Sequence, residues 1–165
     1  MEREQCYKPR PTAPAVSSAR FGILVVDDNE LTRRALKGIL MRDERLTVLG
    51  EASNGASALE SISALKPHLV CLDVLMPRVD GLSVLRAMRD KQLSTAVVII
   101  TGESTSEVVN QAREMGANGF VVKPFNAGTV LSTIDTILRR TSFCTACHQA
   151  HSTEHACPPV WVTPA

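Results

Sequence analysis

Five short apolar runs alternate with segments of helical spacing between residues 21 and 140, and this alternation limits the fold more than any other feature. The runs cover residues 21–26, 46–51, 69–73, 96–101 and 119–123. Continuous apolar runs of this length are typical of strands that helices cover on both faces. Because a helix-length segment separates successive runs, right-handed crossovers would make the strands parallel. We therefore predict an α/β domain with a doubly wound, five-stranded parallel sheet.

The segments between the runs repeat apolar residues at the spacing of one helix face. They predict helices near residues 31–40, 59–65, 82–88 and 108–115, and a last helix over 128–140. Asn29, Asn54 and Asn126 stand where helix starts need a capping side chain, and Gly116 stands where a helix end favours a left-handed residue.

The residues before the domain differ from it in composition. Residues 1–20 carry Pro9, Pro11 and Pro14 with little apolar surface, so we expect a flexible, Pro-rich leader. No apolar run approaches the roughly 20 residues that span a bilayer, and no export signal is visible, so a cytoplasmic protein without membrane contact is expected. The net charge of +1 gives no general attraction to nucleic acid, and no direct binding to it is expected.

The tail, residues 141–165, is rich in Cys and His. Cys144, Cys147, His155 and Cys157 could form a tetrahedral Zn²⁺ site. The spacing between the two halves of this set is shorter than usual, so a flexible tail is the alternative. Cys144 also begins a Cys-x-x-Cys-His pattern of c-type haem attachment, which the missing export signal disfavours.

Polar residues stand at the ends of four of the five apolar runs. Asp27 and Asp28 end the first, Asp73 the third, Thr101 the fourth and Lys123 the fifth. In a doubly wound sheet the ligand crevice lies outside the carboxyl ends of the strands, so these groups would converge there. Like charges 4 Å apart cost about 1 kcal/mol per pair in water and about 4 kcal/mol at an effective dielectric near 20, so the cluster needs a cation. Oxygen ligands favour a hard ion, and we predict Mg²⁺.

A carboxylate at this place can act as a nucleophile toward phosphorus and form an acyl phosphate. Asp73 is the candidate, because Pro77 soon turns the chain away and leaves the carboxylate open. Lys123 and the metal would neutralise charge on the phosphoryl oxygens, and Thr101 can donate its hydroxyl to one of them. Gly102, beside Thr101, leaves phosphorus accessible.

Each of these residues also has an ordinary structural explanation. Asp28 or Asn29 could merely cap a helix, and Thr101 could be an ordinary β-branched strand residue. Lys123 could belong to a solvated turn, and Phe120 could be a core residue. Their joint placement at successive strand ends favours the functional interpretation.

Four motifs occur in a fixed order along the chain. They are Val25-Val26-Asp27-Asp28, Leu72-Asp73-Val74-Leu75-Met76-Pro77-x-x-Asp80-Gly81, Ile100-Thr101-Gly102 and Gly119-Phe120-Val121-Val122-Lys123-Pro124-Phe125. Together they resemble the response-regulator receiver family over residues 21–140. The resemblance implies a flavodoxin-like (βα)5 receiver fold.

The resemblance also implies a role for each matching residue. Asp73 would be the phosphoacceptor, and Asp27, Asp28, Asp73 and the backbone carbonyl of Leu75 would form the Mg²⁺ site. Thr101 and Lys123 would contact the phosphoryl group, Thr101 and Phe120 would be the switch residues, and the Lys123–Pro124 peptide would be cis.

The implied function is that of a phosphoacceptor signalling domain in a two-component phosphorelay rather than an enzyme, although autophosphorylation and autodephosphorylation chemistry would be intrinsic to it. A sensor histidine kinase or phosphotransfer protein would donate the phosphoryl group. The switch would then change a protein-interaction surface read by a downstream protein target. Homodimerisation on phosphorylation is left open.

Other functions lack a sequence feature that they need. A flavin carrier would need a phosphate cradle after the first strand, where Asp27 and Asp28 would repel phosphate, and a dinucleotide enzyme would need a Gly-x-Gly-x-x-Gly turn there. An aspartyl phosphatase would usually carry an acid at Leu75. A phosphate-independent receiver-like interaction module remains the alternative.

Since Leu75 cannot orient an attacking water, we expect a long-lived phosphorylated form.

Overall fold

The structure, a computed structural model, describes residues 20–145, with side chains described as far as residue 139. Five parallel strands form one sheet in the order β2-β1-β3-β4-β5. The strands are β1 (Phe21–Val26), β2 (Leu46–Ala52), β3 (Leu69–Leu72), β4 (Ala96–Thr101) and β5 (Gly119–Val122). The helices are α1 (Glu30–Leu40), α2 (Gly55–Leu65), α3 (Gly81–Asp90), α4 (Ser106–Glu114) and α5 (Ala127–Thr145). The predicted α/β fold with a doubly wound parallel sheet is confirmed.

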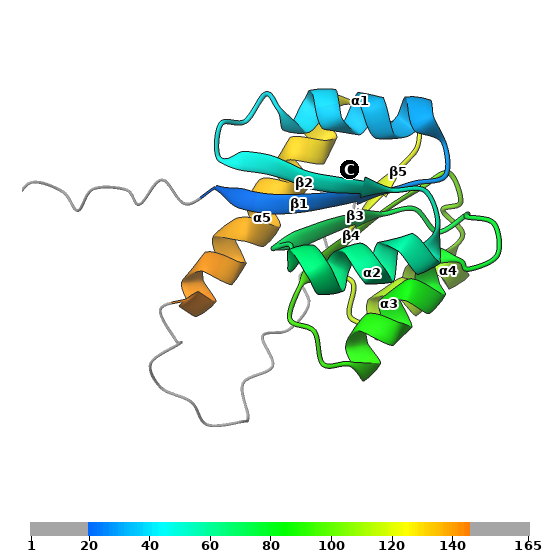
Figure 1. Cartoon of the computed structure of the whole chain (residues 1–165). Coiled ribbons are helices and arrows are strands. Elements are labelled where there is room, and N and C mark those ends of the chain that lie inside the picture. Colours follow the sequence, from blue (N-terminus) through cyan, green and yellow to red (C-terminus); the bar gives the residue numbers. More distant parts are fainter. Residues whose placement is uncertain (1–19, 146–165) are drawn as a thin grey trace, which may run out of the picture.

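Helices cover both faces of the sheet (Figure 1). On one face Ile23 and Val25 of β1 pack with residues of α1 and α5, and on the other Leu24 and Val26 pack with residues of α2, α3 and α4. Successive strand side chains point to opposite faces, so each strand must be apolar at every position to fill both layers. This is why the strands read as continuous apolar runs in the sequence.

The predicted helix signals act as expected. Asn29 and Asn54 are the N-caps of α1 and α2, and the side chain of Asn126 accepts a hydrogen bond from the Thr129 amide at 2.9 Å. Gly116 follows the end of α4 with φ of 80°, in the left-handed region that glycine tolerates best.

Several element ends differ from the sequence prediction, and three of these differences bear on the site or on the tail. Strands β3 and β5 end at Leu72 and Val122, so Asp73 and Lys123 are the first residues of the following loops. Helix α5 continues to Thr145, beyond the predicted end at Arg140, and its backbone includes Cys144. The remaining zinc candidates of the tail and residues 1–19 of the leader lie outside the described residues. Within residues 20–145, no helix combines the length and the hydropathy that crossing a membrane requires.

Arg89 joins the end of α3 to the turn that follows α4. Its Nη1 atom donates to the carbonyls of Leu93 and Thr95 at 2.7 and 3.2 Å, and its Nη2 atom donates to the carbonyl of Gly116 at 2.9 Å. Burial lowers the pKa of Arg89. One side chain therefore satisfies three backbone acceptors that two chain reversals leave without partners.

We predict that Arg89→Met lowers the free energy of unfolding by about 1.5 to 3 kcal/mol, the usual range for hydrogen bonds from a charged group. Urea denaturation followed by circular dichroism measures the change. Arg86→Met is the matched control, since Arg86 lies exposed on the same helix and the substitution removes the same charge. Equal stability of the two variants would contradict the role assigned to Arg89.

Candidate functional site

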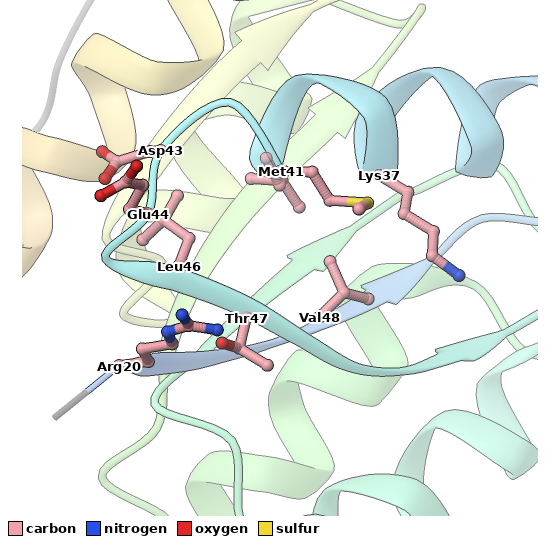
Figure 2. Close-up of a pocket in the computed structure, with 9 residues that line it drawn as sticks. Arg20, Lys37, Met41, Asp43, Glu44, Leu46, Thr47 and Val48 are labelled. Carbon is pink, nitrogen blue, oxygen red and sulfur yellow. The ribbon is translucent and has the colours of Figure 1, made fainter.

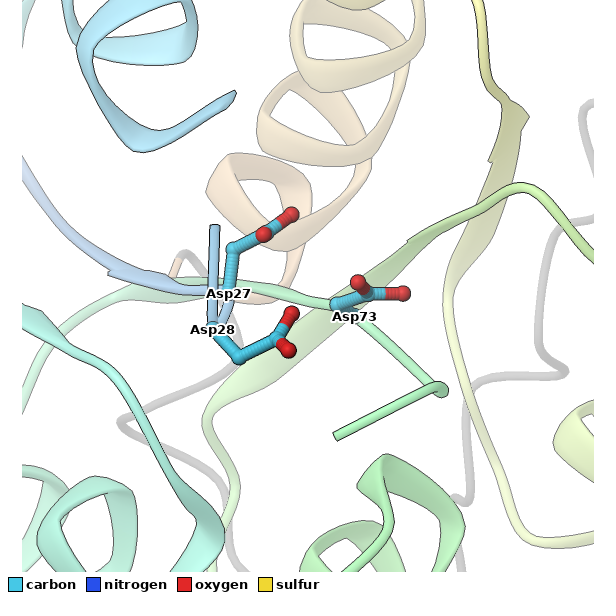
Figure 3. A group of neighbouring side chains, drawn as sticks. All are labelled: Asp27, Asp28 and Asp73. Carbon is cyan, nitrogen blue, oxygen red and sulfur yellow. The ribbon is translucent and has the colours of Figure 1, made fainter. Parts of the chain in front are cut away.

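Three carboxylates meet at the carboxyl edge of the sheet (Figure 3). Oxygens of Asp27, Asp28 and Asp73 lie within 4.8 Å of one another. Because Val26 of β1 pairs with Leu72 of β3, the residues that follow these strands leave the sheet side by side. Asp27 and Asp73 are buried, with 1% and 3% exposure, whereas Asp28 is exposed.

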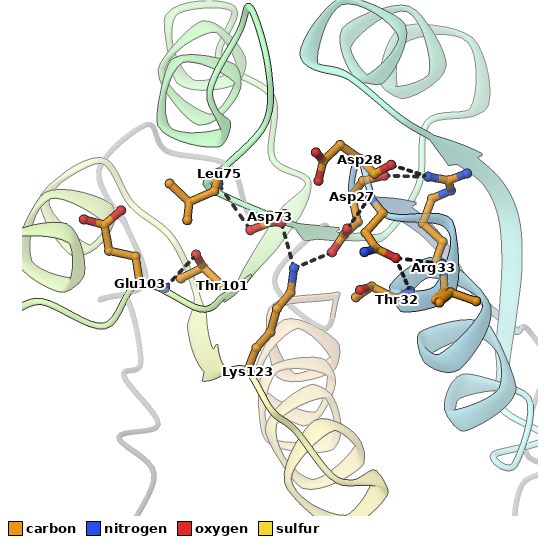
Figure 4. A network of polar contacts seen from close by, with 11 residues as sticks. Asp27, Asp28, Thr32, Arg33, Asp73, Leu75, Thr101, Glu103 and Lys123 are labelled. Atoms are coloured by element: carbon orange, nitrogen blue, oxygen red, sulfur yellow. Dashed lines mark hydrogen bonds and ion pairs between the residues drawn. The ribbon is translucent and has the colours of Figure 1, made fainter.

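Lys123 lies between the two buried carboxylates (Figure 4). Its Nζ atom is 2.7 Å from Oδ2 of Asp27 and 2.7 Å from Oδ2 of Asp73. Lys123 follows β5, its amide donates to the carbonyl of Thr101 at 2.8 Å, and its peptide bond with Pro124 is cis, as the resemblance implies. The sheet thus brings together the four charged site residues predicted from strands one, three and five.

Burial and ion pairing act against each other at this site. Burial raises the pKa of Asp27, and the hydrogen bond from Lys123 offsets this only in part. Burial alone would lower the pKa of Lys123, but its hydrogen bonds with Asp27 and Asp73 outweigh that effect and raise the pKa. Lys123 therefore stays a cation between the carboxylates.

Backbone amides orient the two buried carboxylates. Oδ1 of Asp27 accepts from the amide of Asn29 at 2.9 Å, and Oδ1 of Asp73 accepts from the amide of Leu75 at 3.2 Å. In each carboxylate the other oxygen, Oδ2, pairs with Lys123. The contact with the Leu75 amide places that backbone beside Asp73, while a metal-binding role for the Leu75 carbonyl stays a prediction.

The donor set fits a hard divalent cation. Three carboxylates face one ammonium group, which leaves excess negative charge at the site. All ligand atoms are oxygens, and the exposed Asp28 leaves one side open to water, an arrangement that suits Mg²⁺. Within residues 20–139, the Asp28 carboxylate takes part in no hydrogen bond or ion pair.

The two predicted switch residues are buried. Thr101 is fully buried, and its Oγ1 atom accepts from the amide of Glu103 at 3.2 Å. Phe120 is 3% exposed and packs in the core between the sheet and helices α2, α3 and α4. Neither residue contacts Asp73 through a hydrogen bond within the described part of the chain, so their switch role stays a prediction.

Arg33 is a residue at this edge that the sequence interpretation missed. Its Nη1 atom donates to the carbonyls of Asp27 and Asp28 at 2.8 and 3.3 Å (Figure 4). The sequence does contain a signal for such a residue, namely two arginines near the start of α1. The positive end of the helix dipole disfavours cations there, so an arginine at this place suggests another partner.

A groove of about 370 Å³ lies elsewhere, between the end of α1 and the start of β2 (Figure 2). Residues of both signs of charge line it, namely Arg20 and Lys37 and the acidic Asp43 and Glu44. It lies at the amino end of the strands, whereas the acidic cluster lies at their carboxyl ends. The groove therefore belongs to a different part of the molecule.

A doubly wound sheet with an acidic cluster and one lysine at its carboxyl edge is the architecture of a signal receiver domain. The model of the response regulator receiver domain matches residues 23–135, and the chain belongs to this family. It is 34% identical to the chemotaxis protein CheY of Bacillus subtilis over 116 residues, which cover 70% of this chain and 96% of CheY.

Other similar proteins are longer or were solved as complexes. The chain is 33% identical over 130 residues to the transcriptional regulatory protein PdtaR of Mycobacterium tuberculosis, a match covering 79% of this chain and 62% of PdtaR. The chain spans about half to three fifths of the length of several such relatives. A CheX–CheY–BeF3–Mg²⁺ complex from Borrelia burgdorferi is similar with a TM-score of 0.69 and 26% identity, covering 72% of this chain and 89% of that one.

Gly81 fixes the position of the Asp73 backbone. It is the first residue of α3, and its amide donates to the carbonyl of Val74 at 2.9 Å. A Cβ atom at residue 81 would overlap the carbonyl oxygen of Asp73 and lie 3.0 Å from Cα of Val74. Only a residue without a side chain allows α3 to start this close to the backbone of Asp73 and Val74.

We predict that Gly81→Ala lowers the free energy of unfolding by about 1 to 3 kcal/mol, because backbone must move to admit the new methyl group. Gly38→Ala is the control: apart from its chain neighbours and the backbone of its own helix, no atom of the described residues lies within 4 Å of a Cβ at this position in α1. That variant should gain about 0.5 to 1 kcal/mol from the removal of a helix glycine. Chemical denaturation measures both, and a stable Gly81→Ala protein would refute the close-contact argument.

Proposed function

We propose that Asp73 accepts a phosphoryl group from the phosphohistidine of a sensor histidine kinase or a phosphotransfer protein. Asp27, Asp28 and Asp73, with the carbonyl of Leu75, would hold Mg²⁺. The observation that carries this proposal is the bridge of Lys123 between Asp27 and Asp73, beside a third carboxylate within 4.8 Å.

The chemistry follows from the positions of these atoms. An oxygen of Asp73 attacks phosphorus, the bond from phosphorus to the donor imidazole nitrogen breaks, and the nitrogen keeps the electron pair. The Nζ atom of Lys123, 2.7 Å from Oδ2 of Asp73, is close enough to pair with an oxygen of the arriving phosphoryl group. Bound Mg²⁺ would neutralise further negative charge there.

The response to phosphorylation would start at Thr101. Its Oγ1 atom accepts from the Glu103 amide, so its own proton is available for a phosphoryl oxygen. An inward shift of Thr101 would open space for Phe120, and the surface of α4, β5 and α5 would change between two populated states. A downstream protein would bind that surface in one of the two states. Homodimerisation through the same surface is one such interaction.

The relatives support this proposal. The Borrelia burgdorferi CheY named above was solved with BeF3 and Mg²⁺, a phosphoryl mimic and the cation proposed here. The match to Bacillus subtilis CheY spans nearly all of that chemotaxis protein. A phosphate-independent interaction module would share the fold but would not need three carboxylates and a lysine in one cluster.

The test is labelling of the purified chain with radioactive acetyl phosphate. We expect Mg²⁺-dependent incorporation of one phosphoryl group, lost in Asp73→Asn because an amide is not a nucleophile toward phosphorus. Asp90→Asn is the control, since Asp90 lies exposed at the end of α3 and the substitution makes the same chemical change. Labelling of Asp73→Asn at the native level, or labelling of the native chain without Mg²⁺, would refute the proposal. A folded native chain that takes no label would favour the phosphate-independent module.

The residue two positions after Asp73 controls access of water in this proposal. Leu75 is 55% exposed and offers no side-chain hydrogen-bond donor or acceptor. We expect Leu75→Asn to shorten the lifetime of the phosphorylated form, because an amide can orient an attacking water. Loss of label after removal of acetyl phosphate measures the lifetime. Met41→Asn, a change of another exposed apolar residue at the end of α1, should leave it unchanged.

A further inference from the structure

Arg33 binds the backbone of the two residues that begin the site. A single nitrogen, Nη1, donates to the carbonyl of Asp27 at 2.8 Å and to that of Asp28 at 3.3 Å. The guanidinium therefore fixes two successive peptide groups relative to α1. No carboxylate of the acidic cluster pairs with it among the described interactions.

The Asp28 carboxylate depends on this backbone for its position. It is exposed and makes no hydrogen bond or ion pair within residues 20–139, whereas the Asp27 carboxylate is held by Lys123 and the Asn29 amide. Whatever fixes the backbone at residue 28 thus decides whether its carboxylate faces the other two.

The guanidinium is itself held in place from β2. Its Nε atom is buried without a hydrogen bond and lies 3.4 Å from Oε2 of Glu51. Glu51 also pairs with Lys37 of α1 at 3.0 Å. The side chain of Arg33 is only 15% exposed, against 71% for the neighbouring Arg34, which pairs with Glu30 one turn away.

We propose that Arg33 is a positioning residue for the metal site, holding the Asp27–Asp28 backbone so that the Asp28 carboxylate can bind Mg²⁺. This inference rests on the proposed function. It makes a prediction opposite in sign to simple electrostatics: removing a positive charge near a cation site should strengthen cation binding, whereas loss of the two backbone hydrogen bonds should weaken it.

The experiment measures Mg²⁺ affinity directly, without any phosphoryl donor. Mg²⁺ is titrated into the isotopically labelled chain, and the shifts of backbone amide signals in NMR spectra report binding. We expect Arg33→Met to weaken Mg²⁺ binding about 10-fold, the lower end of the range for residues that orient metal ligands. Arg33→Lys keeps the charge but not the planar donor group, and a smaller loss is expected.

The neighbouring arginine gives matched controls for both substitutions. Arg34→Met and Arg34→Lys make the same changes one residue along the helix, on an exposed side chain, and should bind Mg²⁺ no more weakly than the native chain. If Arg33→Met fails to fold, the comparison of Arg33→Lys with Arg34→Lys decides, since charge is equal in both.

The outcomes separate this inference from the proposed function. Native Mg²⁺ binding with Arg33 variants that bind as tightly as their Arg34 counterparts, or more tightly, overturns the positioning role alone. A native chain that binds no Mg²⁺ overturns both proposals. A role of Arg33 in folding alone would lower the unfolding midpoint in urea without changing Mg²⁺ affinity of the folded protein, and that result also counts against the inference.

Discussion

Repulsion between carboxylates at the carboxyl edge of the sheet is the constraint on which the rest of the site depends. Asp27 and Asp73 are almost fully buried side by side, where like charges cost more than in water. The protein reduces this cost with one ammonium group that contacts both carboxylates, and with a backbone amide that donates a hydrogen bond to the other oxygen of each. One lysine does not balance three acids, and this uncompensated charge is what would attract the Mg²⁺ of the proposed function. The charge imbalance that opposes burial of these groups would thus also supply the affinity of the proposed metal site.

Parallel strand pairing brings these groups together, and this explains how much the sequence could predict. An abrupt change from apolar to charged residues marks the end of a buried strand, so the sequence alone places Asp27, Asp73 and Lys123 at one edge of the sheet. The same reasoning located Thr101. Strand ends were placed one residue late at Asp73 and Lys123, because a charged residue next to an apolar run looks the same in sequence whether its backbone pairs or not.

Contacts that cross between elements could not be predicted in this way. Arg33 extends back across the first turn of α1 to two backbone carbonyls, and its ion-pair partner Glu51 lies on β2. The local sequences of α1 and β2 do not encode how close these two side chains come in space. Gly81 belongs to a motif that the sequence analysis recognises. The reason why this residue must be glycine is visible only in the structure, where α3 packs against the Asp73 carbonyl. Periodicity reports which face of an element is buried, whereas these contacts depend on the relative placement of elements.

The central place of β3 in the sheet has a mechanical consequence. This strand lies between β1 and β4, every one of its residues is buried, and the Asp73 amide is bonded to the carbonyl of Val26. A strand that is paired on both sides and buried along its whole length resists displacement along its axis. Strain from added charge or bulk at Asp73 is therefore not relieved by movement of β3. The segments that can move instead are the loops after the strands and the helices that follow those loops. The stiffness of the sheet thus directs any structural change at Asp73 toward the surface.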